Sequence, residues 1–241
     1  SSILQEGVIQ TEVFSFTKNA SYQLTLKAQF VHPGDRVLLI DDFLANGEAA
    51  FGGIRLLEQA VKENRYQARG VIGIFPANST ASHDDITVWA DESRTIPLAT
   101  LLTQRQQLDK QGKPRLALAD FIAPEGVRDY VGAMAVSIHG SRRWAKEWEA
   151  RNDSYRALLV SSLADRLVEA FAAIAHDKLR LLWNIPEGSG VRPACGYPSQ
   201  PDHQEKETVF TLLHAREEAG MSLTETWMMQ PVSSAVSYTH L

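Results

Sequence analysis

Residues 191–206 decide how the rest of this sequence is interpreted, and they read VRPACGYPSQPDHQEK. Pro193, Pro198 and Pro201 each fix the backbone angle φ, and Gly196 can adopt a conformation that is closed to other residues. The stretch therefore presents an arginine, a tyrosine and a histidine from a stiff loop. A rigid polar loop that runs into a helix is suited to holding a small anionic or zwitterionic ligand. On composition alone, a plain proline-rich connection is the more common interpretation.

A helix is predicted directly after this loop. Asp202 and Glu205 have the D-x-x-E spacing of a capping box, in which two side chains satisfy the first backbone N–H groups of a helix. Val209, Leu212 and Leu213 follow at helical spacing. The loop is therefore predicted to end at a helix N-terminus.

The loop and two later segments resemble one known family. The pattern R-P-A-x-G-Y-P-x-x-P-x-H-x-x-K, followed by TET at 224–226 and SSAVS at 233–237, is similar to the activation (reactivation) domain of cobalamin-dependent methionine synthases. The resemblance covers about residues 66–237. It implies that the loop binds S-adenosylmethionine beside a cobalamin carried by a partner domain. It also implies a one-electron donor, such as a flavodoxin-type protein, and methyl transfer from the sulfonium to cobalt.

The same resemblance implies roles for single residues. Arg192 would pair with the ligand carboxylate, and the backbone of Ala194 would meet adenine. Gly196 belongs to the same cofactor-binding set, and Tyr197 would contact the adenosine. Glu169, upstream of the loop, would lie near the S-adenosylmethionine site. No catalytic residue and no metal ligand is predicted, because the corrin supplies the chemistry.

A long helix is predicted from about Ser154 to Leu182, with Asp153 as its N-cap. Its expected buried stripe consists of aliphatic and aromatic side chains, namely Leu159, Leu163, Leu167, Phe171 and Ile174.

Three ionisable residues of this helix, Asp165, Glu169 and His176, fall on a neighbouring face. Spacing alone favours a solvated flank. The resemblance implies that Asp165 contacts the displaced axial histidine of the cobalamin-binding domain, where a carboxylate would stabilise a protonated imidazole.

The N-terminal part suggests a different chemistry. Residues 36–50 read RVLLIDDFLANGEAA, an apolar run followed by paired acids, a small loop and a helix start. Backbone N–H groups at such a helix start can hold a phosphate, while the acids face sugar hydroxyls or magnesium. The predicted ribose-phosphate site comprises Asp41, Asp42, Ala45, Asn46, Gly47, Glu48 and Ala49.

With FSFTK at 14–18, this segment resembles part of a xanthine phosphoribosyltransferase. The chain is therefore interpreted as an apparent chimera: residues 1–60 as a partial phosphoribosyltransferase-like segment and residues 61–241 as an activation domain truncated at its C-terminus. The seam is expected within 53–68. A phosphoribosyltransferase fragment that binds phosphoribosyl pyrophosphate remains the alternative function. A non-catalytic interaction protein is a third interpretation, for which no positive feature is found. The isolated chain is expected to be inactive.

The expected fold class is α+β, with a mixed or antiparallel sheet and long helices, preceded by a partial α/β phosphoribosyltransferase segment. The absence of a G-x-G-x-x-G motif disfavours a Rossmann methyltransferase. Extended segments are predicted at 8–16, 22–30, 69–75, 84–90, 115–121 and 130–138, with a turn at 76–78 and a short strand plus helix within 96–107.

Bulk properties restrict the remaining possibilities. The 241 residues are 44% hydrophobic and 22% charged, with a net charge of −5 and a pI near 5.8. Such an acidic protein is not expected to bind nucleic acid or an anionic membrane. Neither a signal peptide nor a membrane-spanning run is recognised. The single cysteine, Cys195, permits no internal disulfide and is compatible with the expected cytoplasmic location. Because the sequence begins at Ser1, it is expected to be a fragment.

Overall fold

The fold is described from a computed structural model, which describes residues 8–15, 20–27, 58, 60, 62–107, 112–186 and 190–240. By its internal contacts the chain divides into two compact units. One combines residues 1–65 with 144–163, and the other combines residues 66–143 with 164–241. The second unit contains the main sheet and the loop of interest.

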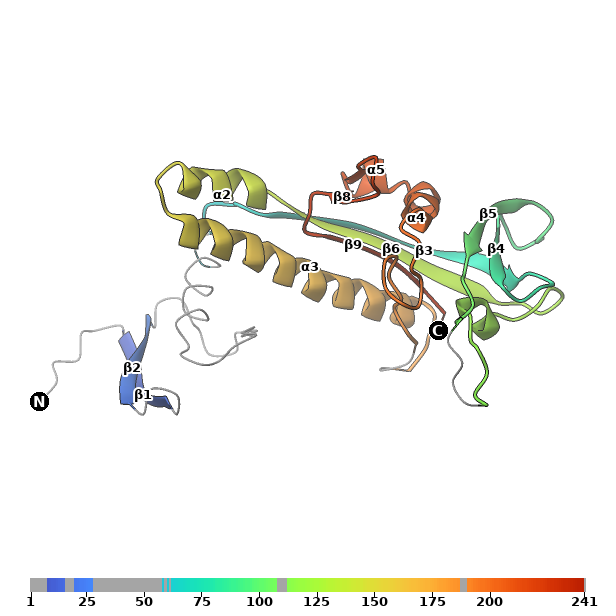
Figure 1. The fold of residues 1–241 in the computed structure, drawn as a ribbon, viewed down its shortest axis with the longest axis horizontal. Coiled ribbons are helices and arrows are strands. Elements are labelled where there is room, and N and C mark those ends of the chain that lie inside the picture. The colour runs from blue at the N-terminus through green and yellow to red at the C-terminus, as the bar shows by residue number, and fades with distance from the viewer. Residues whose placement is uncertain are drawn as a thin grey trace, which may run out of the picture. The chain divides into compact units, whose positions relative to one another are not determined.

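A five-stranded sheet forms the centre of the second unit (Figure 1). Each neighbouring pair of strands in it is antiparallel, so the predicted α+β class with an antiparallel sheet is confirmed. The strand order is β5 (Pro97–Leu102), β4 (Asp85–Trp89), β3 (Gln67–Ser79), β6 (Tyr130–His139) and β9 (Ser234–Thr239).

Strand β6 is buried along its length because helices cover both faces of the sheet. Side chains of a strand alternate between faces. Met134, Val136 and Ile138 therefore join the helix α3 (Ser154–Leu182) in one core. Ala133 and Ala135, on the other face, join a second core with α4 (Glu205–Leu213). Figure 1 shows α3 along one side of the sheet and α4 and α5 (Ala215–Glu218) on the other.

The helix α3 has the predicted bounds, and its N-cap is confirmed: the backbone N–H of Arg156 donates to the Asp153 carboxylate at 2.9 Å. Its most buried stripe differs from the prediction. Of the residues predicted to be buried, Ile174 is 64% exposed, and Leu159, Leu163 and Leu167 are only half-buried. Most of the side chains that α3 buries against the sheet are shorter. The sheet and α3 are closely packed there, since a Cβ on Gly70 would come within 2.9 Å of the Phe171 ring. Within the second unit, the deeply buried apolar residues of α3 are Ala164, Val168, Ala172, Ala175 and Leu179.

Three local predictions are wrong. Strand β3 continues through Pro76–Asn78, where a turn was expected, because Ala77–Ser79 pair with β4. No helix follows β5 within 103–107. In place of a strand at 115–121, a 3-10 helix forms at Leu118–Phe121. The Asp120 carboxylate causes this change, since it accepts the Ala117 N–H at 2.8 Å.

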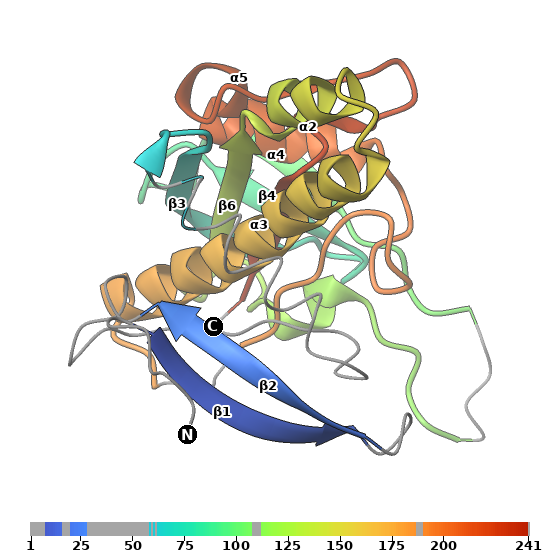
Figure 2. The same ribbon diagram turned by 90° about the vertical axis from the view of Figure 1, so that its left-hand side faces the viewer.

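The N-terminal hairpin confirms the first two predicted extended segments. Strands β1 (Val8–Ser15) and β2 (Ala20–Lys27) pair in antiparallel register, and Figure 2 shows them side by side. In the same compact unit, Arg65 lies over the Trp144 ring and forms a 2.7 Å ion pair with Glu147 of α2 (Ser141–Glu149).

Two further short strands, β7 (Ser222–Leu223) and β8 (Met229–Gln230), form a small sheet of their own. Even the 29 residues of α3 lack an apolar stretch that could cross a bilayer, and the same holds for the other helices in the described ranges.

Candidate functional site

The edge strand β9 fixes the beginning of the loop. The hydroxyls of Ser237 and Thr239 donate to the backbone carbonyls of Pro193 and Val191. Tyr238, between them, points to the opposite face and joins the core beside α4. Because these side chains alternate along the strand, residues 191–193 are held on the face that α3 covers. The loop therefore begins on one side of the edge strand.

A tight turn then presents Tyr197. The Gly196 N–H donates to the Gln200 carbonyl at 2.8 Å, and the Gln200 N–H donates to the Tyr197 carbonyl at 2.8 Å. Cys195 and Gln200 are buried, whereas Tyr197 is 65% exposed. The turn thus holds a large aromatic side chain at the surface, where it can stack against a ligand.

Gly196 is required at its position for two reasons. Its φ is +98°, a region that side-chain-bearing residues rarely adopt. In addition, a Cβ there would lie 2.2 Å from Cε1 of the His203 ring. The prediction that glycine supplies a special conformation in this loop is confirmed.

Replacing Gly196 with alanine is expected to destabilise the protein more than the same change at Gly126. Gly126 also has a positive φ, +91°, but nothing lies within 4 Å of its hypothetical Cβ. Both variants suffer backbone strain of about 1–2 kcal/mol, and Gly196→Ala adds an overpacking cost of about 1–3 kcal/mol. Urea denaturation of both variants measures the difference. Equal losses of unfolding free energy would show that the His203 ring moves aside without cost.

Asp165 and Glu169 of α3 are both exposed, as their spacing in the sequence suggested. The nearest oxygen of Glu169 is 3.9 Å from a terminal guanidinium nitrogen of Arg192. The Ser233 hydroxyl donates to the Asp165 carboxylate at 2.6 Å. His176 differs from them, because it is buried and lies 3.3 Å from the Thr239 hydroxyl. This side chain is therefore part of the packing between α3 and β9, and its burial lowers its pKa.

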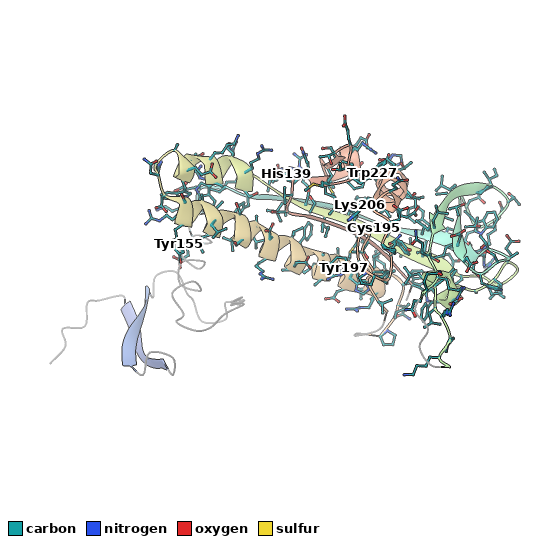
Figure 3. All side chains as sticks on the ribbon, in the orientation of Figure 1. His139, Tyr155, Cys195, Tyr197, Lys206 and Trp227 are labelled. Atoms are coloured by element: carbon teal, nitrogen blue, oxygen red, sulfur yellow. The ribbon has the colours of Figure 1, made fainter. Side chains whose placement is uncertain are left out.

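A buried polar cluster lies behind the exposed turn. It contains Cys195, Gln200, Glu205 and Lys206, each at most 6% exposed. The Cys195 thiol lies 3.4 Å from the Gln200 side-chain carbonyl, and burial raises the thiol pKa to about 12. Burial also raises the pKa of Glu205 and lowers that of Lys206. Figure 3 shows Cys195 and Lys206 together with Tyr197 in this part of the unit.

The predicted capping box does not form. The Glu205 carboxylate accepts the N–H of Leu102 at 3.0 Å and so connects α4 to the sheet. Asp202 instead accepts the N–H of Gln204 at 2.8 Å, in a short turn before the helix. The helix nevertheless follows the loop directly, as predicted.

Sequence reasoning missed the anchors of the loop. Ser233, Ser237 and Thr239 supply the hydroxyls that hold Asp165 and the loop carbonyls. For Ser237 and Thr239 the signal was two polar side chains two residues apart, which share one face of a strand. His203 and Lys206 were within the recognised motif, yet no role was assigned to them.

The predicted ribose-phosphate residues, Asp41, Asp42 and 45–49, lie outside the described residues. In the ranges that are described, no cluster of three or more histidine, cysteine or acidic side chains could hold a metal ion. The predicted binding residues that are described, namely Glu169, Arg192, Ala194, Gly196 and Tyr197, belong to the second unit.

Comparisons with known proteins cover most of the chain. The model of a family described as "Vitamin B12 dependent methionine synthase, activation domain" matches residues 52–240. One similar solved structure is a crystal structure of the MetH reactivation domain bound to AdoHcy. It shares 31% sequence identity with this chain, covering 97% of this chain and 78% of that one, with a TM-score of 0.76.

Proposed function

The chain belongs to the family of vitamin B12 dependent methionine synthase activation domains, and we propose that its loop at 191–197 binds S-adenosylmethionine. The ligand would be the methyl donor for reductive remethylation of cobalamin, and the solved relative that binds AdoHcy supports this choice.

The observation that carries the proposal is the pair formed by Arg192 and Glu169. Their charged ends are 3.9 Å apart, which is longer than a hydrogen bond, and the Glu169 side chain is 65% exposed. The amino-acid end of S-adenosylmethionine also carries one negative and one positive group. The guanidinium would take the ligand carboxylate through two N–H donors, and Glu169 would take the ammonium.

The rest of the loop suits the nucleoside end of the ligand. The exposed Tyr197 ring would contact the adenosine, and the backbone of Ala194 would meet adenine. Gly196, by lacking a side chain, keeps the backbone of this turn in its required conformation. The hydroxyl anchors of β9 orient these groups before the ligand arrives, which reduces the entropy lost on binding.

Membership of this family also implies a cobalamin-binding domain as partner. When that domain is present, its cobalamin supplies the cobalt that accepts the ligand's methyl group, with one electron from a flavodoxin-type donor and release of S-adenosylhomocysteine. On this chain, Asp165 would meet the displaced histidine of the partner domain. Its carboxylate is oriented by Ser233 and lies on an exposed part of α3, so it could stabilise an imidazolium.

Titration calorimetry tests the proposed ligand. S-adenosylmethionine is expected to bind with a stoichiometry near one, and adenosine about tenfold or more weakly, because adenosine lacks the carboxylate and the ammonium. Magnesium phosphoribosyl pyrophosphate, titrated in parallel, is expected to give no binding heat. Binding of phosphoribosyl pyrophosphate without any binding of S-adenosylmethionine would overturn the proposal.

A further inference from the structure

Lys206 is a buried cation that the proposed binding function leaves without a role. It lies on the first turn of α4 and is 5% exposed. Its ammonium donates to Nδ1 of His203 at 2.7 Å and to the Trp227 carbonyl at 3.0 Å. Among the described residues, no carboxylate lies within 4.0 Å of this ammonium in a salt bridge. Burial of such a charge without an acidic partner is costly and lowers its pKa.

The two acceptors of Lys206 belong to different turns. The His203 ring occupies the space beside Gly196, within the turn that presents Tyr197. Trp227 belongs to a second turn, which is closed by the Thr224 N–H donating to the Met228 carbonyl at 2.9 Å. One ammonium therefore bridges the ligand loop and the turn at 224–228. Figure 3 shows Lys206 lying with Cys195, Tyr197 and Trp227 in this part of the second unit.

We propose that Lys206 is a positioning residue, which acts through His203 to fix where Tyr197 meets the adenosine part of the ligand. The inference rests on the proposed S-adenosylmethionine site and deepens it. Lys206 does not touch the ligand. It holds the His203 ring against Gly196, and this contact sets the backbone position of the next residue, Tyr197.

A packing role alone does not explain a lysine at this position. Methionine has a similar length and would fill the same buried space without the cost of a desolvated charge. What methionine cannot do is donate hydrogen bonds to a histidine and a backbone carbonyl at once. The charge is thus retained at a site where its hydrogen bonds connect two turns beside the ligand loop.

The test compares Lys206→Met with the wild type by titration calorimetry. The dissociation constants of both S-adenosylmethionine and adenosine are expected to rise about tenfold, because both ligands use Tyr197. The stoichiometry per folded molecule is expected to stay near one. A merely structural role would lower the stoichiometry and leave the dissociation constants unchanged, which would overturn the inference. Lys146→Met, at an exposed position of α2, is the matched control and is expected to change neither value.

A double-mutant cycle locates the effect. In a Tyr197→Ala background, Lys206→Met is expected to change affinity less than twofold, because the group that it positions is absent. A full tenfold change in that background would contradict action through Tyr197. His203→Phe serves as a second variant at an exposed position, since it keeps a ring beside Gly196 but loses the Nδ1 acceptor. It is expected to weaken both ligands several-fold, and an unchanged affinity would also overturn the inference.

The wild-type titration separates this inference from the proposed function. If the wild type does not bind S-adenosylmethionine, the proposed function fails. If it binds and both Lys206→Met and His203→Phe bind equally well, only the positioning role fails.

Discussion

Replacing Arg192 with alanine is expected to weaken the binding of S-adenosylmethionine by roughly two orders of magnitude. A two-pronged hydrogen bond between a guanidinium and a carboxylate is the strongest polar contact that this loop can offer. Its loss, together with a Glu169 left without its cation, is expected to cost about 3 kcal/mol, or roughly two orders of magnitude in affinity. Arg192→Lys should restore part of the binding, because a point charge attracts the carboxylate but cannot reproduce both hydrogen bonds.

Adenosine provides the internal control for this variant. It lacks the carboxylate, so its affinity should not respond to Arg192→Ala but should fall in Tyr197→Ala. Arg142→Ala, at an exposed position of α2, removes an arginine elsewhere and is expected to leave both ligands unaffected. Unchanged affinity of Arg192→Ala for S-adenosylmethionine would show that the loop has been assigned wrongly.

The largest loss of stability is expected from Phe210→Ala. Phe210 is 1% exposed and packs in the core between α4 and the sheet. Removing a buried phenylalanine ring costs about 3–5 kcal/mol, because apolar contacts are lost and a cavity remains. For a protein of this size, that corresponds to a fall in Tm of about 6–20 °C. Differential scanning calorimetry measures the change.

Thr211→Ala is the matched control for this substitution. Thr211 is the next residue of the same helix but is exposed, so its replacement is expected to change the free energy of unfolding by about 0.5 kcal/mol or less. A similar Tm for Phe210→Ala and the wild type would mean that α4 does not cover the sheet as described.

Elements determined by nearby residues could be predicted from the sequence. The strand β6 was recognisable from its apolar run, and α3 from its length and its Asp153 cap. The 3-10 helix at Leu118–Phe121 could not be predicted, because the apolar residues of 115–121 alternate as they would in a strand. Asp120 caps this turn by accepting the Ala117 N–H, and it also forms an ion pair with Arg105 at 2.7 Å, a partner on another segment that no local pattern reveals.

The binding loop was predictable in part for the same reason. Its prolines and Gly196 restrict the backbone wherever they occur, so stiffness and the glycine requirement could be inferred directly. The anchors on Ser237 and Thr239 depend on β9 lying beside β6, and the buried state of Lys206 depends on the turn that contains Trp227. These contacts join parts of the chain that are distant in sequence, and only the fold brings them together.

The rate at which Cys195 reacts with an alkylating reagent can report how often the loop opens. It is the single cysteine of the chain, it is buried, and its raised pKa keeps it in the unreactive thiol form. Alkylating reagents can therefore reach it only during moments when the turn behind Tyr197 opens. The rate at which the native protein is labelled is thus expected to report how often that opening occurs, and a ligand that binds the closed turn is expected to slow the labelling.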